Sequence, residues 1–189
     1  MFFKKKITLE LFVKEHFVPL IDEMINSELD LLEKDVSENS SIKIEKNILH
    51  FEVFLLFSYL SGRGLSAISG FDMNVGVKFS TLLDEIMQKK FVNLKLNKKW
   101  LDEERGAVLS DMFNYYKNKS TAYREAELSY HNSTIDKDEL SKQICKIFFS
   151  IENDDINDQL VKIMGEIHKG GFIFLYEKLN HFSKEYKLS

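Results

Sequence analysis

The sequence predicts a mainly α-helical fold, and two observations lead to that prediction. The 189 residues include one proline, Pro19, and eight glycines, where average usage would give roughly nine and thirteen. Apolar residues also recur at spacings of three and four along most of the chain, which is typical of one helix face. We therefore expect a helical bundle of about six to eight helices, with at most a small β-hairpin or extended segment.

The first predicted helix runs from Thr8 to about Lys34. Pro19 interrupts its apolar stripe, because the proline ring would clash with the carbonyl of Glu15. We expect either a kink or a new helix with Pro19 in its first turn. A polar break follows from Asp35 to Ser41.

Residues 42–53 fit two interpretations, a helix or a β-hairpin. The absence of breakers as far as Leu60 favours the helix. The longest uncharged apolar stretch runs from Val53 to Gly62, which is about half of what a membrane span requires. We therefore expect no transmembrane segment.

Glycines concentrate in one part of the chain, at Gly62, Gly64, Gly70 and Gly76. This pattern predicts the main loop of the fold. It also supplies the one internal boundary, at 62–76, within an expected single helical domain of residues 1–189. Inside it, residues 71–79 alternate between apolar and polar, which predicts a strand, and a helix is expected to resume at Ser80 or Thr81.

The next helix is predicted from about Lys98 to Lys117, with a pause from Asn118 to Thr121 and a weaker helix after it. Asp136 followed by Glu139 is typical of a capping pair, and the helix it opens is expected to end near Ile151.

The last helical region is predicted to begin at a cap on Asn153 or Asp154 and to continue to the C-terminus. Gly170-Gly171 interrupts it, at a cost of about 2 kcal/mol relative to alanines. A turn between two helices or a close backbone approach would offset that cost, and the turn is the favoured interpretation.

Composition limits the classes of function. The net charge is −4 and the pI is about 5.8, so a nucleic-acid or anionic-membrane partner would need a local basic patch. Cys145 is the single cysteine, and a small buried hydrophobic role is favoured over a reactive thiol. Charged residues interrupt the N-terminal apolar stretch, so we expect no signal peptide and a cytoplasmic location.

One basic segment could contact phosphates, and its aromatic residues could stack on bases. A solvated helix face with inward aromatics is the favoured alternative, because three acidic residues follow at once. The segment contains Lys89, Lys90, Lys95, Lys98, Lys99 and Trp100.

Asp154 and Asp158 lie one helical turn apart and could bridge a hard cation. Their place at the start of a helix favours a dipole-stabilising role instead, and we predict no cofactor. Glu127 and His131 are also spaced i,i+4, and a polar surface pair is the favoured interpretation.

Tyr116, Tyr123 and Tyr130 recur every seven residues and would form one stripe on a continuous helix. The edge of the bundle core is the favoured interpretation, and a protein interface is the alternative.

The leading functional hypothesis is a non-enzymatic intracellular interaction or regulatory module that binds a protein partner or a second copy of itself. The first alternative is a sensor or enzyme with a ligand or metal in the bundle core. Its candidate residues are His50, Glu52, Asp154, Asp158 and His168. The second alternative is nucleic-acid binding through Lys89–Lys99.

Overall fold

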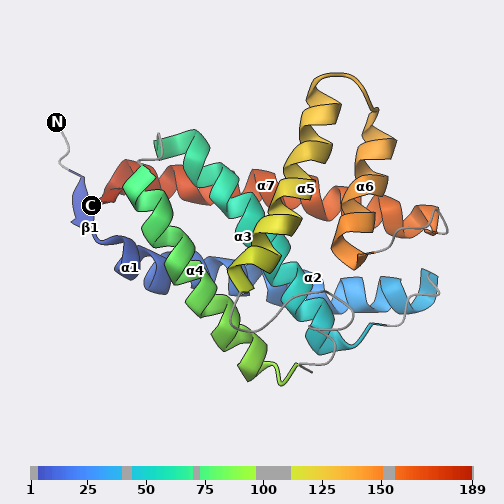
Figure 1. The fold of residues 1–189 in the computed structure, drawn as a ribbon, viewed down its shortest axis with the longest axis horizontal. Coiled ribbons are helices and arrows are strands. Elements are labelled where there is room, and N and C mark those ends of the chain that lie inside the picture. The colour runs from blue at the N-terminus through green and yellow to red at the C-terminus, as the bar shows by residue number, and fades with distance from the viewer. Residues whose placement is uncertain (1–3, 40–43, 70–72, 97–111, 151–155, 189) are drawn as a thin grey trace.

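The computed structural model describes residues 4–39, 44–69, 73–96, 112–150 and 156–188, and it is mainly α-helical, as predicted (Figure 1). In chain order the described elements are β1 (Lys5–Ile7), α1 (Leu9–Phe12), the π-helical segment η1 (Val13–Phe17), α2 (Val18–Asn39), α3 (Lys46–Ser69), α4 (Met73–Asn93), α5 (Met112–His131), α6 (Lys137–Phe149), α7 (Asp158–Glu185) and β2 (Tyr186–Leu188).

Helix α3 is the centre of the bundle. Every residue from Phe51 to Ser61 is buried, and α3 packs on α7, α2, α5 and α6. A helix that is apolar on all sides must be covered on all sides, which explains the long uncharged stretch in its sequence. None of the described helices has the length and apolarity needed to cross a membrane.

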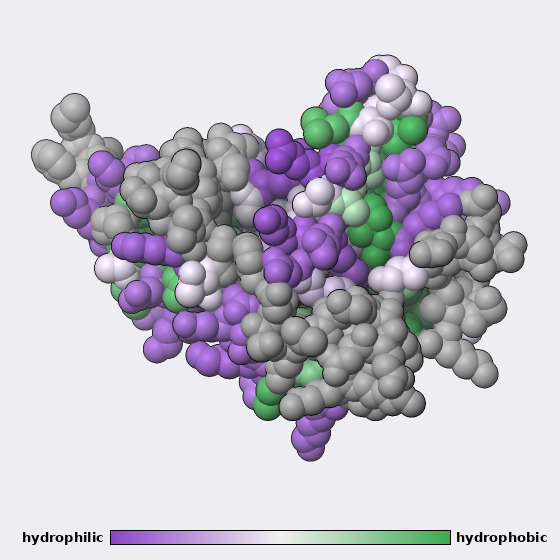
Figure 2. All heavy atoms as spheres, in the orientation of Figure 1, coloured by the Kyte–Doolittle hydropathy of each residue, from purple (hydrophilic) through white to green (hydrophobic). Residues whose placement is uncertain are grey.

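Helices α5 and α6 form an antiparallel hairpin that packs on α7 through α6 (Figure 1). The predicted cap at the start of α6 is confirmed, because Asp136 accepts a hydrogen bond from the Glu139 backbone N–H at 2.9 Å. The helix ends at Phe149, where Ser150 adopts a left-handed conformation with φ of 55°. Figure 2 shows hydrophilic side chains over much of the described surface on this face of the molecule.

Two short strands near the chain ends pair in parallel, β1 with β2, with Lys5 opposite Tyr186 and Ile7 opposite Leu188. The segments Lys5–Ile7 and Tyr186–Leu188 therefore lie side by side (Figure 1). The strands are not the segments in which the sequence predicted β structure. The last helix also ends at Glu185 rather than at the C-terminus.

The disruption expected at Pro19 takes the form of a π-helical segment. Helical structure is continuous from Leu9 to Asn39, but Val13–Phe17 is π-helical just before the proline. Proline has no N–H to donate to Glu15, and a π turn is one way for a helix to absorb that missing bond. The polar break expected from Asp35 is wrong as far as Asn39, because α2 continues and buries Val36.

The described residues of the glycine-rich segment are helical and do not form the predicted loop, and Gly70 lies outside the described residues. Helix α3 contains Gly62 and Gly64 and ends at Ser69. At Gly64 an added Cβ would lie 3.1 Å from Leu179 Cδ1, so the missing side chain lets α7 approach closely. The helix interpretation of residues 42–53 is confirmed from Lys46 onward. The single domain with a boundary at 62–76 stays a prediction.

The strand predicted at 71–79 is wrong, because α4 begins at Met73 and not at Ser80 or Thr81. The buried residues of this helix recur every four positions, at Phe79, Leu83, Met87 and Phe91. A continuous four-residue stripe buries more apolar surface here than a lone strand could, since an unpaired strand leaves its backbone groups unsatisfied.

The pause predicted at Asn118–Thr121 is also wrong, because α5 is continuous from Met112 to His131. The start of α7 lies later than predicted. Asn157 is its N-cap, and its side-chain oxygen accepts a hydrogen bond from the Gln159 N–H at 2.7 Å. The predicted caps Asn153 and Asp154 lie outside the described residues.

The turn predicted at Gly170-Gly171 is wrong, because α7 is one helix from Asp158 to Glu185. Close approach is the reason for one of the two glycines. An added Cβ at Gly171 would lie 3.0 Å from Phe57 Cε1 and 3.3 Å from Leu60 Cδ1, both on α3. At Gly170, by contrast, an added Cβ would meet nothing within 4 Å.

Candidate functional site

Two polar regions border α7, one buried and one open. The buried region lies among α3, α5, α6 and α7, and we call it the buried polar network. The open region is a groove between α2 and α7. The two regions differ in whether their acidic side chains form ion pairs with other residues of the bundle.

Glu127 on α5 is the centre of one half of the buried polar network, with 6% of its side chain exposed. The Tyr59 hydroxyl donates to its Oε2 at 2.6 Å, and His168 Nε2 lies 2.8 Å from its Oε1. Because a carboxylate can only accept, the imidazole nitrogen donates. Arg63 forms an ion pair with the same Oε1, so three other side chains, from α3 and α7, converge on one carboxylate.

The electrostatics of this half follow from its partners. Burial opposes the ionisation of Glu127, but hydrogen bonds from His168 and Tyr59 and the charge of Arg63 outweigh it and lower the pKa of Glu127. Burial and the bond to Glu127 raise the pKa of Tyr59 well above its ordinary value. Arg63 also lies over the Phe172 ring of α7, 4.9 Å from its centroid.

Glu52 on α3 is the centre of the other half and is fully buried. It accepts a hydrogen bond from the Tyr115 hydroxyl at 2.8 Å and forms an ion pair with Lys119. Lys119 also donates to the Phe148 carbonyl of α6 at 2.9 Å. The Tyr59 ring of the first half lies 5.2 Å from the ring of Tyr123 on α5.

The network joins helices by polar contacts between buried side chains. A buried carboxylate without a partner would be costly, so each pair holds its two helices in one relative position. Glu52 and Lys119 hold α5 and α6 against α3. Glu127 and His168 hold α7 against α5, which fixes the helix that also forms one wall of the open groove.

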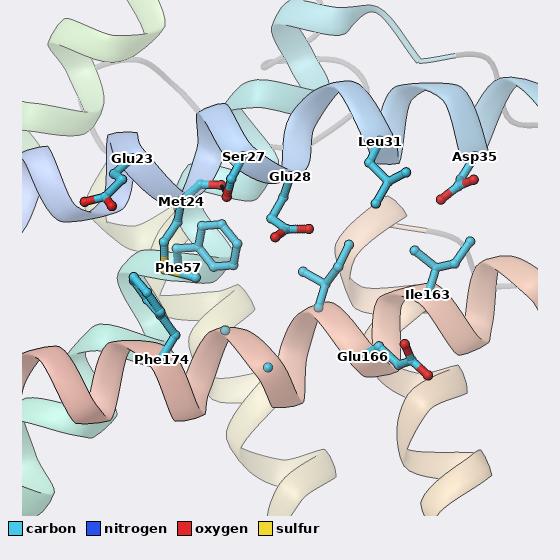
Figure 3. A pocket seen from close by; sticks show the side chains of 13 residues that line it. Glu23, Met24, Ser27, Glu28, Leu31, Asp35, Phe57, Ile163, Glu166 and Phe174 are labelled. Carbon is cyan, nitrogen blue, oxygen red and sulfur yellow. Dashed lines mark hydrogen bonds between the residues drawn. The ribbon is translucent and has the colours of Figure 1, made fainter.

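The open groove lies between α2 and α7 and has a volume of about 570 Å³ (Figure 3). The two helices run antiparallel along it, and their side chains face each other across it. The lining residues come from one face of each helix and from α3 beneath them. They are Glu23, Met24, Ser27, Glu28, Leu31, Asp35, Phe57, Ile163, Glu166, Ile167, Gly170, Gly171 and Phe174.

Apolar side chains form the floor of this α2–α7 groove. Met24 and Phe57 are buried, Ile163, Ile167 and Phe174 are half-buried, and Leu31 is 56% exposed. Gly170 leaves additional space, since a Cβ there would touch nothing. Open apolar surface between two helices is typical of a binding site for another molecule.

Acidic side chains form the rim of the groove, and we call these four the rim acids: Glu23, Glu28, Asp35 and Glu166. Within the described part of the chain, none of them takes part in an ion pair. The lining set contains no lysine, arginine or histidine. The groove is therefore apolar inside and negative at its edges.

The three predicted interface tyrosines lie on one continuous helix, α5, but in different surroundings. Tyr123 is 1% exposed in the core, and burial raises its pKa. Tyr116 is half-buried, and burial raises its pKa to about 12. Tyr130 is 40% exposed. None of them lines the α2–α7 groove.

The predicted basic segment is described only in part, because Lys98, Lys99 and Trp100 lie outside the described residues. Lys89 and Lys95 are exposed. Lys90 forms an ion pair with Asp22 and lies 5.4 Å from the centroid of the Phe54 ring. Its positive charge is therefore neutralised within the bundle.

Among the residues named for a core site, Glu52 and His168 lie in separate halves of the buried polar network. His50 Nε2 is buried without a hydrogen-bond partner among the described residues. Burial, followed by the charge of Lys90, lowers the pKa of His50. Asp158 is exposed in the first turn of α7, and Asp154 lies outside the described residues. The described side chains contain no group of three or more potential metal ligands.

Sequence reasoning missed four members of the buried polar network: Tyr59, Arg63, Tyr115 and Lys119. It also placed Glu127 in a surface pair with His131, which is wrong, because Glu127 is buried and bonds His168. One signal was available, because Tyr115, Lys119, Tyr123 and Glu127 recur every four residues. Polar residues in a buried-face pattern indicate a paired interior cluster. Cys145 is buried as predicted, and burial raises its pKa to about 12.

The fold and the groove define a helical bundle with an acid-rimmed apolar groove. The chain matches no protein-family model, and comparisons with curated proteins and with solved structures find no significant similarity.

Proposed function

We propose that this protein is an interaction module that binds a protein partner in the α2–α7 groove. The observation that carries the proposal is the open apolar floor, which includes Leu31 at 56% exposed beside the half-buried Ile167 and Phe174. Covering such surface releases water and stabilises a complex by about 25 cal/mol per Å² of apolar area.

The rigidity of the walls also supports binding. The buried polar network fixes α7 on α5 and α3. The absence of a side chain at Gly171 lets α7 approach Phe57 of α3 closely. A groove whose walls are already in place costs a partner less ordering on binding. The polar groups of the network bind one another, which supports a structural role for them rather than a catalytic one.

A cytoplasmic location is part of the proposal. It is supported by the buried, unpaired thiol of Cys145, because disulfides are rare in that compartment.

The experiment fills the groove without disturbing the core. Gly170 has free space around its would-be Cβ, so Gly170→Phe places a ring in the groove. A photo-reactive phenylalanine analogue replaces Leu31, and cross-linked proteins are identified by mass spectrometry. We expect a defined partner to be captured by this protein and by the matched control Gly170→Ala, but not by Gly170→Phe. Equal capture by all three folded proteins would contradict the proposal.

A further inference from the structure

We infer that the partner segment is an amphipathic helix of about three turns whose apolar stripe is flanked by lysine or arginine. The inference rests on the proposed function, since it names what the α2–α7 groove binds. We argue it from the charge of the groove, the shape of the groove and the asymmetry of its rim.

The charge of the groove selects a cationic partner. The rim acids carry four carboxylates around one apolar floor, and no basic side chain lines the groove. None of the four forms an ion pair with a described residue. Opposite charges at the edge of an interface raise the association rate and select between partners, and like charges exclude the wrong ones. The four carboxylates would repel an anionic segment, although Lys178 lies 5.1 Å from the ring centroid of Phe174 at one end of the groove.

The shape of the groove fits a helix. Its walls are two antiparallel helices with α3 as the floor (Figure 3). The stretch of α2 from Glu23 to Asp35 spans about 18 Å at 1.5 Å per residue, which corresponds to about three helical turns. A third helix laid along this groove would place apolar residues at positions i, i+3, i+4 and i+7 against Met24, Ile167 and Phe174.

The rim is asymmetric, and this asymmetry predicts an uneven distribution of basic residues on the two flanks of the partner helix. Three rim acids lie on α2 and one, Glu166, lies on α7. The basic residues of the partner should therefore be denser on the flank that faces α2. A helix with a single basic flank is expected to bind in only one orientation.

The test uses two synthetic helical peptides and the full chain. The first peptide has leucines at i, i+3, i+4 and i+7 with lysines on both flanks, and the second carries glutamates in place of the lysines. Fluorescence anisotropy gives each affinity at low and high salt. We expect the lysine peptide to bind at least about tenfold more tightly than the glutamate peptide, with a difference that shrinks as salt rises.

Two charge-matched variants locate the effect. The variant E23Q/E28Q/D35N/E166Q removes the rim acids, and we expect it to bind the lysine peptide about tenfold more weakly. The control E15Q/E38Q/E125Q/E177Q removes four exposed acids outside the groove and should bind as the unaltered chain does. Both variants are compared after circular dichroism confirms that they are folded.

The outcomes separate the inference from the proposed function. Equal binding of the two peptides, no binding of either, or no effect of removing the rim acids would overturn the amphipathic basic helix as partner. If one of these results is found but Gly170→Phe still abolishes cross-linked capture, the proposed function is supported and only the inference about the partner helix fails. Concentration-dependent self-association that Gly170→Phe removes would identify a second copy as the occupant and would overturn the inference.

Discussion

Acidic side chains lie in opposite environments in the two polar regions that border α7. In the buried polar network, Glu52 is fully buried and Glu127 nearly so, and each binds a cation and at least one tyrosine hydroxyl. In the α2–α7 groove, the rim acids are partly or fully exposed, and none pairs with a described residue. The buried carboxylates need their partners for the fold to be stable, whereas the rim acids remain accessible to solvent.

The contrast separates carboxylates that are paired inside the fold from carboxylates to which the proposed function assigns a role in binding. A buried, paired carboxylate contributes to one fixed arrangement of helices. An exposed carboxylate without an ion-pair partner does not fix one helix against another in this way. Three experiments test this difference between the two regions.

The largest effect is expected from breaking a buried pair. Lys119→Met removes the cation from Glu52 and leaves a carboxylate at 0% exposure without its ion-pair partner. We expect a loss of about 3–5 kcal/mol in the free energy of unfolding, measured by urea denaturation. The double variant Glu52→Gln/Lys119→Met removes both charges and should recover part of that loss. Equal losses in the two variants would show that the pair has no electrostatic role.

Replacing Gly170 or Gly171 of α7 by alanine is expected to change the stability by a smaller amount, with opposite signs at the two positions. Gly171→Ala should destabilise the protein by about 1–2 kcal/mol, because the new Cβ would press on Phe57 and Leu60. Gly170→Ala should stabilise it by about 0.5–1 kcal/mol, because alanine favours the helix and meets no neighbour. Thermal denaturation of both variants measures the difference. Stabilisation by both changes would contradict the close approach of α7 to α3.

The smallest effect is expected in the pH profile. The pKa of Glu127 is lowered in the folded chain, so its pairing stabilises the fold above the ordinary glutamate pKa of about 4.5. That stabilisation is lost as pH falls through the lowered folded-state pKa. The difference in unfolding free energy between the unaltered chain and Glu127→Gln should therefore shrink only below about pH 4.5. Glu125→Gln, an exposed neighbour on α5, is the control for removing one carboxylate.

The local sequence pattern was sufficient to predict the helices that have clear apolar stripes and capping residues. The α6 cap at Asp136 and the burial of Cys145 follow from residue type and spacing alone. Local pattern failed at Gly62, Gly64 and Gly171, which were interpreted as loops or turns. Two of these glycines allow contacts with residues more than a hundred positions away, Gly64 with Leu179 and Gly171 with Phe57. No spacing rule along one helix can show such a contact.

The sequence by itself determined the mainly helical class, because scarce proline and glycine and a three-to-four spacing act within a few residues. It also named Glu52 and His168 among residues of interest, although not their partners. The tertiary structure was needed to show that Glu127 binds Tyr59, Arg63 and His168. It was also needed to show that Glu23, Glu28 and Asp35 line one apolar groove together with Glu166. The physical reason is that burial and pairing of a charge depend on which helices meet, and helices that meet here are far apart in the chain.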